Sequence, residues 1–110
     1  AIEDWEAGNI DSSTGQDISG DNTIRSKNYI SVVPSTTYYV KSSATLVICR
    51  YDADKNFLGY NNRLNEVIAL SADTHFMRFR TATAYGTSYK NDICINVSGE
   101  HDGEYVPYNG

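Results

Sequence analysis

The stretch HFMRFRTA, residues 75–82, decides the fold class of this chain. Successive side chains of a β-strand point to opposite faces of its sheet. Met77 and Phe79 therefore fall on one face, and Arg78 and Arg80 fall on the other. If the two apolar side chains face the core, the two arginines lie on the outer face. This alternation predicts a strand with one buried face.

Similar short runs of β-branched and aromatic residues recur along the chain, separated by turn formers at intervals of about 8–12 residues. No window carries the apolar spacing of an amphipathic helix. We therefore predict an all-β fold, an antiparallel jelly-roll-like β-sandwich with two sheets packed face to face. The expected strands are residues 24–25, 29–33, 36–41, 45–51, 57–60, 66–70, 76–81, 93–97 and 104–106.

The polar segment IDSSTGQDISGDN, residues 10–22, separates Trp5 from the first of these strands. A flexible linker here would leave the large ring of Trp5 outside the domain with nothing to cover it. We therefore interpret residues 1–9 as a first strand or a clamp on the sandwich, and residues 10–22 as a loop. Its Asp and Ser side chains can satisfy backbone groups and its glycines permit tight turns. Residues 1–110 are then one domain.

Charge excludes two classes of partner. The chain carries a net charge of −5, and its nine basic residues are scattered. Proteins that bind nucleic acid or anionic membranes normally show a clustered basic face, so neither partner is expected. No apolar run is long enough to span a membrane. The chain opens with Ala1 rather than methionine, which indicates a piece cut from a longer polypeptide or a processed product.

Two local features carry further expectations. Cys49 and Cys94 lie in apolar runs, which favours two buried thiols, with a disulfide as the alternative. In YDADKNF, residues 51–57, Asp52 can accept hydrogen bonds from the backbone that follows it. Asn56 tolerates the left-handed conformation that closes a hairpin loop of three to five residues.

Nothing in the chain predicts catalysis. A glycosidase needs two carboxylates across a cleft, and the fourteen acidic residues lie mostly in turns. There is no G-x-S-x-G motif, and neither His75 nor His101 lies in a catalytic motif. We therefore expect that the protein is not an enzyme.

Several short motifs resemble a domain of minor structural and tail proteins from phages and prophages of Gram-positive bacteria. They are WEAGNI (5–10), Thr14-Gly15, IRSKNYISV (24–32), YDADKNF (51–57) and YVPY (105–108). Such domains are similar to the jelly-roll carbohydrate-binding modules of secreted glycoside hydrolases. The segment DWEAG is similar to the opening of some of those modules, and NDICINV is similar to their closing strand. The chain departs from them in having one tryptophan, Trp5, which the resemblance places in the core.

The resemblance implies a non-catalytic, extracellular or virion-borne recognition domain that binds polysaccharide, either a cell-surface (cell-wall) or a plant-type glycan. Other tail or enzyme domains would lie in the same polypeptide. The alternative is a structural module of a phage tail that docks other protein subunits and binds no sugar. An aromatic-and-arginine groove would favour the first, and a flat apolar patch would favour the second.

Five residues are candidates for sugar contact. Arg50, Arg78 and Arg80 can supply guanidinium forks for hydroxyls or carboxylates if their strands adjoin. Surface ion pairing with neighbouring acids, worth ~0–1 kcal/mol each, is the alternative role for the strand arginines. Tyr85 and Tyr89 lie in the small-residue loop TATAYGTSYKND and can present rings beside a sheet. Packing over a sheet edge is the alternative role for these tyrosines.

We expect that the protein requires no cofactor, with a structural calcium ion kept as an alternative. No EF-hand motif is present in residues 10–22. The resemblance matches Glu6 and Asp92 to acidic residues of the opening and closing strands. If those strands lie together, the two carboxylates would offer Ca²⁺ hard oxygen ligands.

Overall fold

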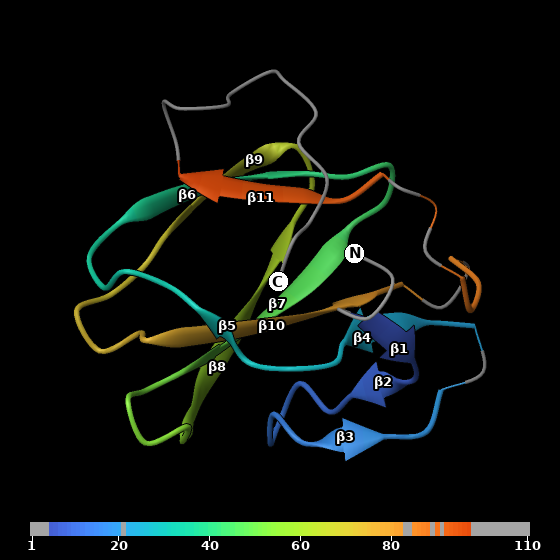
Figure 1. Ribbon diagram of the computed structural model, residues 1–110, viewed down its shortest axis with the longest axis horizontal. Helices are drawn as coiled ribbons and strands as arrows, with labels where there is room; N and C mark the ends of the chain where they lie inside the picture. The colour runs from blue at the N-terminus through green and yellow to red at the C-terminus, as the bar shows by residue number, and fades with distance from the viewer. Residues whose placement is uncertain (1–4, 21, 83–84, 89, 91, 98–110) are drawn as a thin grey trace.

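The computed structural model describes residues 5–20, 22–82, 85–88, 90 and 92–97 of the chain. Within these ranges eleven β-strands form and no helix, so none is available there to cross a membrane. The strands are β1 (Trp5–Ala7), β2 (Asn9–Ile10), β3 (Asp17–Ile18), β4 (Ile24–Ser26), β5 (Ile30–Ser31), β6 (Thr37–Lys41), β7 (Leu46–Tyr51), β8 (Phe57–Arg63), β9 (Glu66–Ala69), β10 (Phe76–Thr81) and β11 (Cys94–Val97) (Figure 1).

The strands form antiparallel sheets, which confirms the predicted all-β class. The largest sheet has six strands in the order β1-β4-β10-β7-β8, with β5 also paired to β10. A second sheet has the order β11-β6-β9, and β2 pairs with β3. Eight of the expected strands appear at their predicted places, and the expected strand 104–106 lies outside the described residues. The jelly-roll arrangement, which has eight strands in two Greek keys, stays a prediction.

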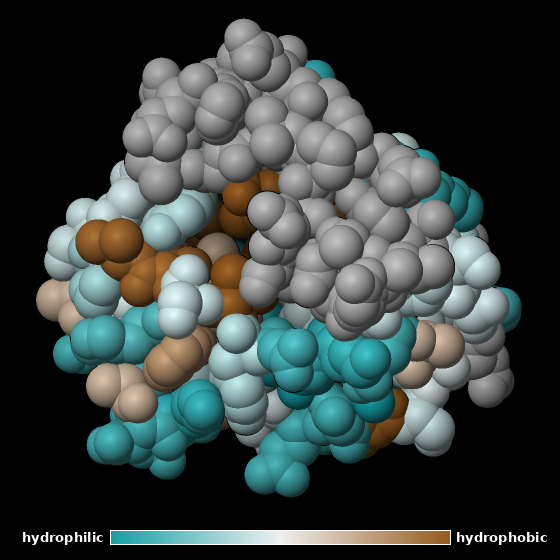
Figure 2. Space-filling model, viewed as in Figure 1, coloured by the Kyte–Doolittle hydropathy of each residue, from teal (hydrophilic) through white to brown (hydrophobic). Residues whose placement is uncertain are grey.

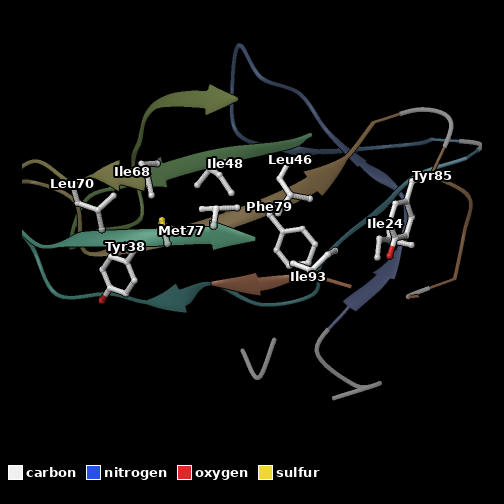
Figure 3. Packing of buried hydrophobic residues seen from close by; sticks show 11 residues of the cluster. Ile24, Tyr38, Leu46, Ile48, Ile68, Leu70, Met77, Phe79, Tyr85 and Ile93 are labelled. Atoms are coloured by element: carbon white, nitrogen blue, oxygen red, sulfur yellow. The ribbon is translucent and has the colours of Figure 1, made fainter. Parts of the chain in front are cut away.

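Side chains from the two larger sheets meet in one core. Figure 3 shows side chains of β6, β7, β9 and β10 together in the space between the strands. Met77 and Phe79 are buried there, as the alternation predicted. Trp5 is partly buried and packs against the same cluster. The members are Ile24, Tyr38, Val40, Leu46, Ile48, Ile68, Leu70, Met77, Phe79, Tyr85 and Ile93.

A second, smaller core lies on the other face of the six-stranded sheet. Ile10 from β2 packs there with Val47, Cys49 and Tyr51 from β7. The segment 10–22 therefore belongs to the domain, as predicted. It is more than a loop, because β3 within it pairs with β2 as a hairpin that covers the outer face. Cys49 is a buried free thiol, as predicted, and the side chain of Cys94 lies outside the described part of the chain.

Gly15 places the tip of this hairpin against the aromatic side chains of β7 and β8. Its backbone φ is +72°, in the left-handed region that favours glycine. A Cβ atom at residue 15 would lie 2.9 Å from Cε2 of Tyr51 and would overlap the ring of Phe57. The hydroxyl of Tyr51 donates a hydrogen bond of 2.7 Å to the Gly15 carbonyl. The close approach of backbone to ring therefore requires glycine here.

We predict that Gly15→Ala destabilises the protein more than Gly86→Ala does. Both glycines have positive φ, which costs a side-chain-bearing residue roughly 1–3 kcal/mol. At Gly86 a Cβ would meet no atom of the described residues within 4 Å, whereas at Gly15 it would overlap two rings. That overlap should add roughly 1–3 kcal/mol. Chemical denaturation of both variants measures the difference, and equal losses of unfolding free energy would contradict the close packing at Gly15.

Candidate functional site

A pocket of about 470 Å³ opens between the β2–β3 loop and the turn that joins β7 to β8. Figure 2 shows hydrophilic side chains gathered along the lower edge of the molecule, where Figure 1 places β3 and the lower end of β8. Most of the pocket's side chains are polar, and three are aromatic. The lining residues are Thr14, Gly15, Gln16, Asp17, Tyr29, Tyr51, Lys55, Asn56, Phe57 and Arg78.

Aromatic rings that meet edge to face form one wall of the pocket. The ring centroids of Tyr29 and Tyr51 lie 4.9 Å apart, with an interplanar angle of 84°. Phe57 meets Tyr51 at 5.8 Å, and Phe76 meets Tyr29 at 5.9 Å. Such edge-to-face pairs are a favoured arrangement of aromatic side chains. Tyr29 is 37% exposed, so this packing holds its ring in place while part of it remains accessible to a ligand.

The phenol of Tyr51 is a structural group. Burial raises the pKa of Tyr51 well above its usual value, and the neighbouring Cys49 adds to the increase. The hydroxyl is therefore neutral at physiological pH, and its proton is donated to the Gly15 carbonyl. This bond ties the loop to the sheet.

Arg78 lines the pocket beside these rings, with its Cζ 5.6 Å from the centroid of Tyr29. It lies on β10, is only 5% exposed, and forms an ion pair of 2.6 Å between Nη1 and Oδ1 of Asp17 on β3. Its Nη2 donates to the carbonyl of Ser26 on β4 at 2.7 Å. A buried charge is costly unless it is paired and hydrogen-bonded. This guanidinium therefore fixes the hairpin to the sheet.

Two further arginines bind the backbone of the same hairpin. Nε of Arg25 pairs with Oε2 of Glu6 at 2.7 Å, and its Nη1 donates to the carbonyls of Asn9 at 2.9 Å and Ile18 at 3.1 Å. Arg80, opposite Arg25 in the β4–β10 register, donates from Nε to a further hairpin carbonyl, that of residue 10, at 3.1 Å. Polar contacts therefore supplement the small apolar contact beneath the hairpin.

The structure does not bring the three predicted arginines together. Arg78 and Arg80 lie on the outer face, as predicted, but the hairpin covers them and they serve its attachment. The register partner of Arg50 is Met77, whose side chain enters the inter-sheet core. Arg50 therefore lies on the opposite face, where its Nε donates to Oδ1 of Asn61 at 2.7 Å. Of the three, only Arg78 lines the pocket.

Tyr85 is a core residue and not an exposed ring. It is 4% exposed, and its hydroxyl accepts a hydrogen bond from the Lys90 amide at 3.0 Å and donates to Asp92. The sequence places Tyr85 in a loop of small residues and gives no indication that its side chain is buried in the core. Tyr89, the other predicted loop ring, lies outside the described residues. Sequence reasoning also missed the pocket residues Tyr29 and Lys55, although it recognised the hairpin turn that contains Lys55.

The two acidic residues considered for calcium have other partners. Glu6 pairs with Arg25, and the Asp92 carboxylate accepts hydrogen bonds from Tyr85 and Ser43. Glu6 lies on β1, and Asp92 lies two residues before β11. These two strands belong to different sheets and do not pair with each other. In the described part of the chain no three His, Cys, Asp or Glu side chains form a metal-binding group. The calcium hypothesis stays a prediction.

The turn between β7 and β8 is held by Asp52, as the sequence predicted. Its Oδ1 accepts hydrogen bonds of 2.9 Å from the amides of Asp54 and Asn56, and its Oδ2 accepts one from Nδ2 of Asn56 at 3.1 Å. The left-handed residue of the turn is Lys55, with φ +66°, rather than Asn56. This turn places Nζ of Lys55 at 5.2 Å from the centroid of the Tyr29 ring.

We predict that this turn loosens in acid. Hydrogen bonds from Asn56 lower the pKa of Asp52, so folding favours its ionised form. The resulting stability is present above the ordinary carboxyl pKa of about 3.9 and is lost as pH falls through the lowered value. An NMR titration of the Asn56 amide should show its transition below the ordinary value, and Asp52→Asn should abolish it. A transition at or above the ordinary value would contradict the hydrogen-bond assignment.

We also predict that Asp17→Asn weakens the fold by about 1–3 kcal/mol, since it removes a charged hydrogen-bond acceptor from buried Arg78. Asp54→Asn is the matched control, because the Asp54 side chain is exposed and makes no ion pair within the described chain. Its effect should stay within about 0.5 kcal/mol. Urea denaturation measures both. An Asp17→Asn variant as stable as the parent would show that Arg78 does not need this partner.

Comparison with known proteins assigns the chain to no family. No protein-family model, curated protein or solved structure matches the chain. The functional conclusion therefore depends on the pocket and on the chemistry of the residues that line it.

Proposed function

We propose that this domain is a non-catalytic recognition module that binds polysaccharide in the pocket between the β2–β3 loop and the β7–β8 turn. The observation that carries the proposal is the combination of a half-exposed ring, Tyr29, with polar side chains beside it, including Gln16 and Asn56. A sugar offers a C–H face for aromatic contact and hydroxyl groups for hydrogen bonds. The pocket offers partners for both.

The form of the pocket suits weak binding of one or two sugar units within a longer chain. It is an open hollow between two hairpins, so it desolvates little of a bound polymer. Binding also has to offset the ordering of a flexible chain. We therefore expect dissociation constants in roughly the micromolar-to-millimolar range. Weak binding of this kind suits a domain that works within a larger extracellular or virion-borne polypeptide.

The carboxylates support a binding role over hydrolysis. Among the described residues that line the pocket, Asp17 is the one carboxylate. Its oxygens are held at 2.6 Å by Arg78 and at 3.5 Å by Arg25. Glycoside hydrolysis usually uses a pair of carboxyl groups that flank the bond to be cleaved. An acid held in two ion pairs is suited to building the pocket wall.

The alternative proposal is a phage-tail assembly module that docks other protein subunits and binds no sugar. A flat apolar surface would favour it. The site described above is hollowed and mainly polar, so the polysaccharide proposal has the better support.

We predict that Tyr29→Ala lowers glycan affinity by about tenfold or more, equivalent to about 1.4 kcal/mol per factor of ten. Tyr60→Ala is the matched control, because Tyr60 is an exposed tyrosine that does not line the pocket. Affinity electrophoresis or titration against soluble glycans measures both, with melting curves to check the fold. Arg78 and Tyr85 are unsuitable test positions, since both are buried and their loss would mix stability with binding.

Three outcomes separate the proposals. Loss of binding in Tyr29→Ala with retention in Tyr60→Ala supports the pocket. Binding that survives in Tyr29→Ala would place the sugar site on another face. If no glycan binds the folded parent protein, the assembly proposal replaces the polysaccharide proposal.

A further inference from the structure

We infer that the polysaccharide unit recognised by this pocket is acidic, and that its carboxylate or phosphodiester group pairs with Lys55. The inference rests on the proposed function and adds to it the charge of the ligand. It follows from the charge balance of the lining residues, the conformation of the turn and the placement of the nearby acids.

Among the described residues, one positive charge that lines the pocket has no carboxylate partner. Its charged lining residues are Asp17, Lys55 and Arg78. Asp17 and Arg78 neutralise each other at 2.6 Å. Within the described chain, no carboxylate lies within 4.0 Å of the Lys55 ammonium, which lies over the rings of Tyr29 at 5.2 Å and Phe76 at 5.4 Å. The protein as a whole carries a net charge of −5, so a positive side chain with no acidic neighbour differs from the overall charge balance.

The acidic residues of the same turn do not fill this role. Asp52 and Asp54 line a different hollow of about 260 Å³, together with Asp73 and His75. The Asp52 carboxylate is also occupied by the amide groups of its own turn. The turn therefore directs its carboxylates to one side and its lysine to the other, toward the rings.

Lysine is an unfavourable residue for the backbone conformation at position 55. Its φ of +66° costs a side-chain-bearing residue conformational energy that glycine would not incur. The lysine side chain is exposed and extends over two aromatic rings. A cation held over a ring face gains a cation–π interaction and leaves its remaining donors open. A ligand that touches Tyr29 would bring its substituents within reach of this ammonium.

A uronic acid has the matching chemistry. Its pyranose C–H groups can contact the exposed part of Tyr29, and its carboxylate can accept hydrogen bonds from Lys55. A sugar that carries a phosphodiester would present the same single negative charge. Because the ion pair would be partly exposed, salt should screen it. Its contribution to affinity should be about threefold to tenfold at low ionic strength.

The test compares an acidic polymer with its neutral counterpart. Polygalacturonate and its methyl ester share one backbone, and a phosphomannan with its dephosphorylated form tests the other source of charge. The proteins are the parent, Lys55→Gln, Lys55→Arg and Lys90→Gln. Lys90 is the matched control, since its Nζ lies 4.6 Å from the Tyr85 ring centroid but outside this pocket.

The expected result is that the parent prefers a charged polymer over its neutral form by about threefold to tenfold, and that added salt reduces the preference. Lys55→Gln should lose the preference and keep residual binding, while Lys55→Arg and Lys90→Gln should retain it. Equal binding of charged and neutral forms, or an undiminished preference in Lys55→Gln, overturns this inference and leaves the proposed function intact. Absence of binding to every polymer, neutral or charged, contradicts the proposed function itself.

Discussion

The ion pair between Arg78 and Asp17 is the interaction on which this architecture depends. A guanidinium that is only 5% exposed lies in the middle of a sheet and requires a counter-charge. The polar β2–β3 hairpin supplies it and thereby covers the outer face of β7 and β10. Ile10 is the one residue of β2 and β3 in the small apolar core, so this ion pair and the hydrogen bonds from Arg25, Arg80 and Tyr51 hold the polar hairpin against the sheet.

The pocket follows from how the hairpin is held. Asp17 fixes one side of it, and the contact of Gly15 with Tyr51 fixes the tip of the loop. The other side is the β7–β8 turn, which Asp52 holds through its own backbone amides. The loop of the β2–β3 hairpin and the β7–β8 turn, both polar, therefore form a hollow above a shared set of aromatic rings. A polar opening over an aromatic wall is suited to sugars.

Sequence reasoning predicted the strands and the orientation of their side chains. Met77 and Phe79 were placed inside and Arg78 outside, because the period of a strand depends only on the local backbone. It could not predict that the outer face is covered, since β2 and β3 are two residues long and show no alternation. The depth of Tyr85 likewise depends on packing far from its own loop. The left-handed conformation fell on Lys55 rather than Asn56 because Asp52 sets the hydrogen bonds of the whole turn.

The ion pair between β3 and β10 also has a consequence for the order of folding. Asp17 and Arg78 are 61 residues apart in the chain, and Arg78 and Ser26 are 52 apart. Contacts of such long range require the closure of large loops before they stabilise anything, which slows the folding of β-rich proteins. The β7–β8 turn, by contrast, closes through residues four apart. One side of the pocket therefore depends on local contacts, whereas the other requires both halves of the chain, so the complete pocket cannot form before the distant strands have met.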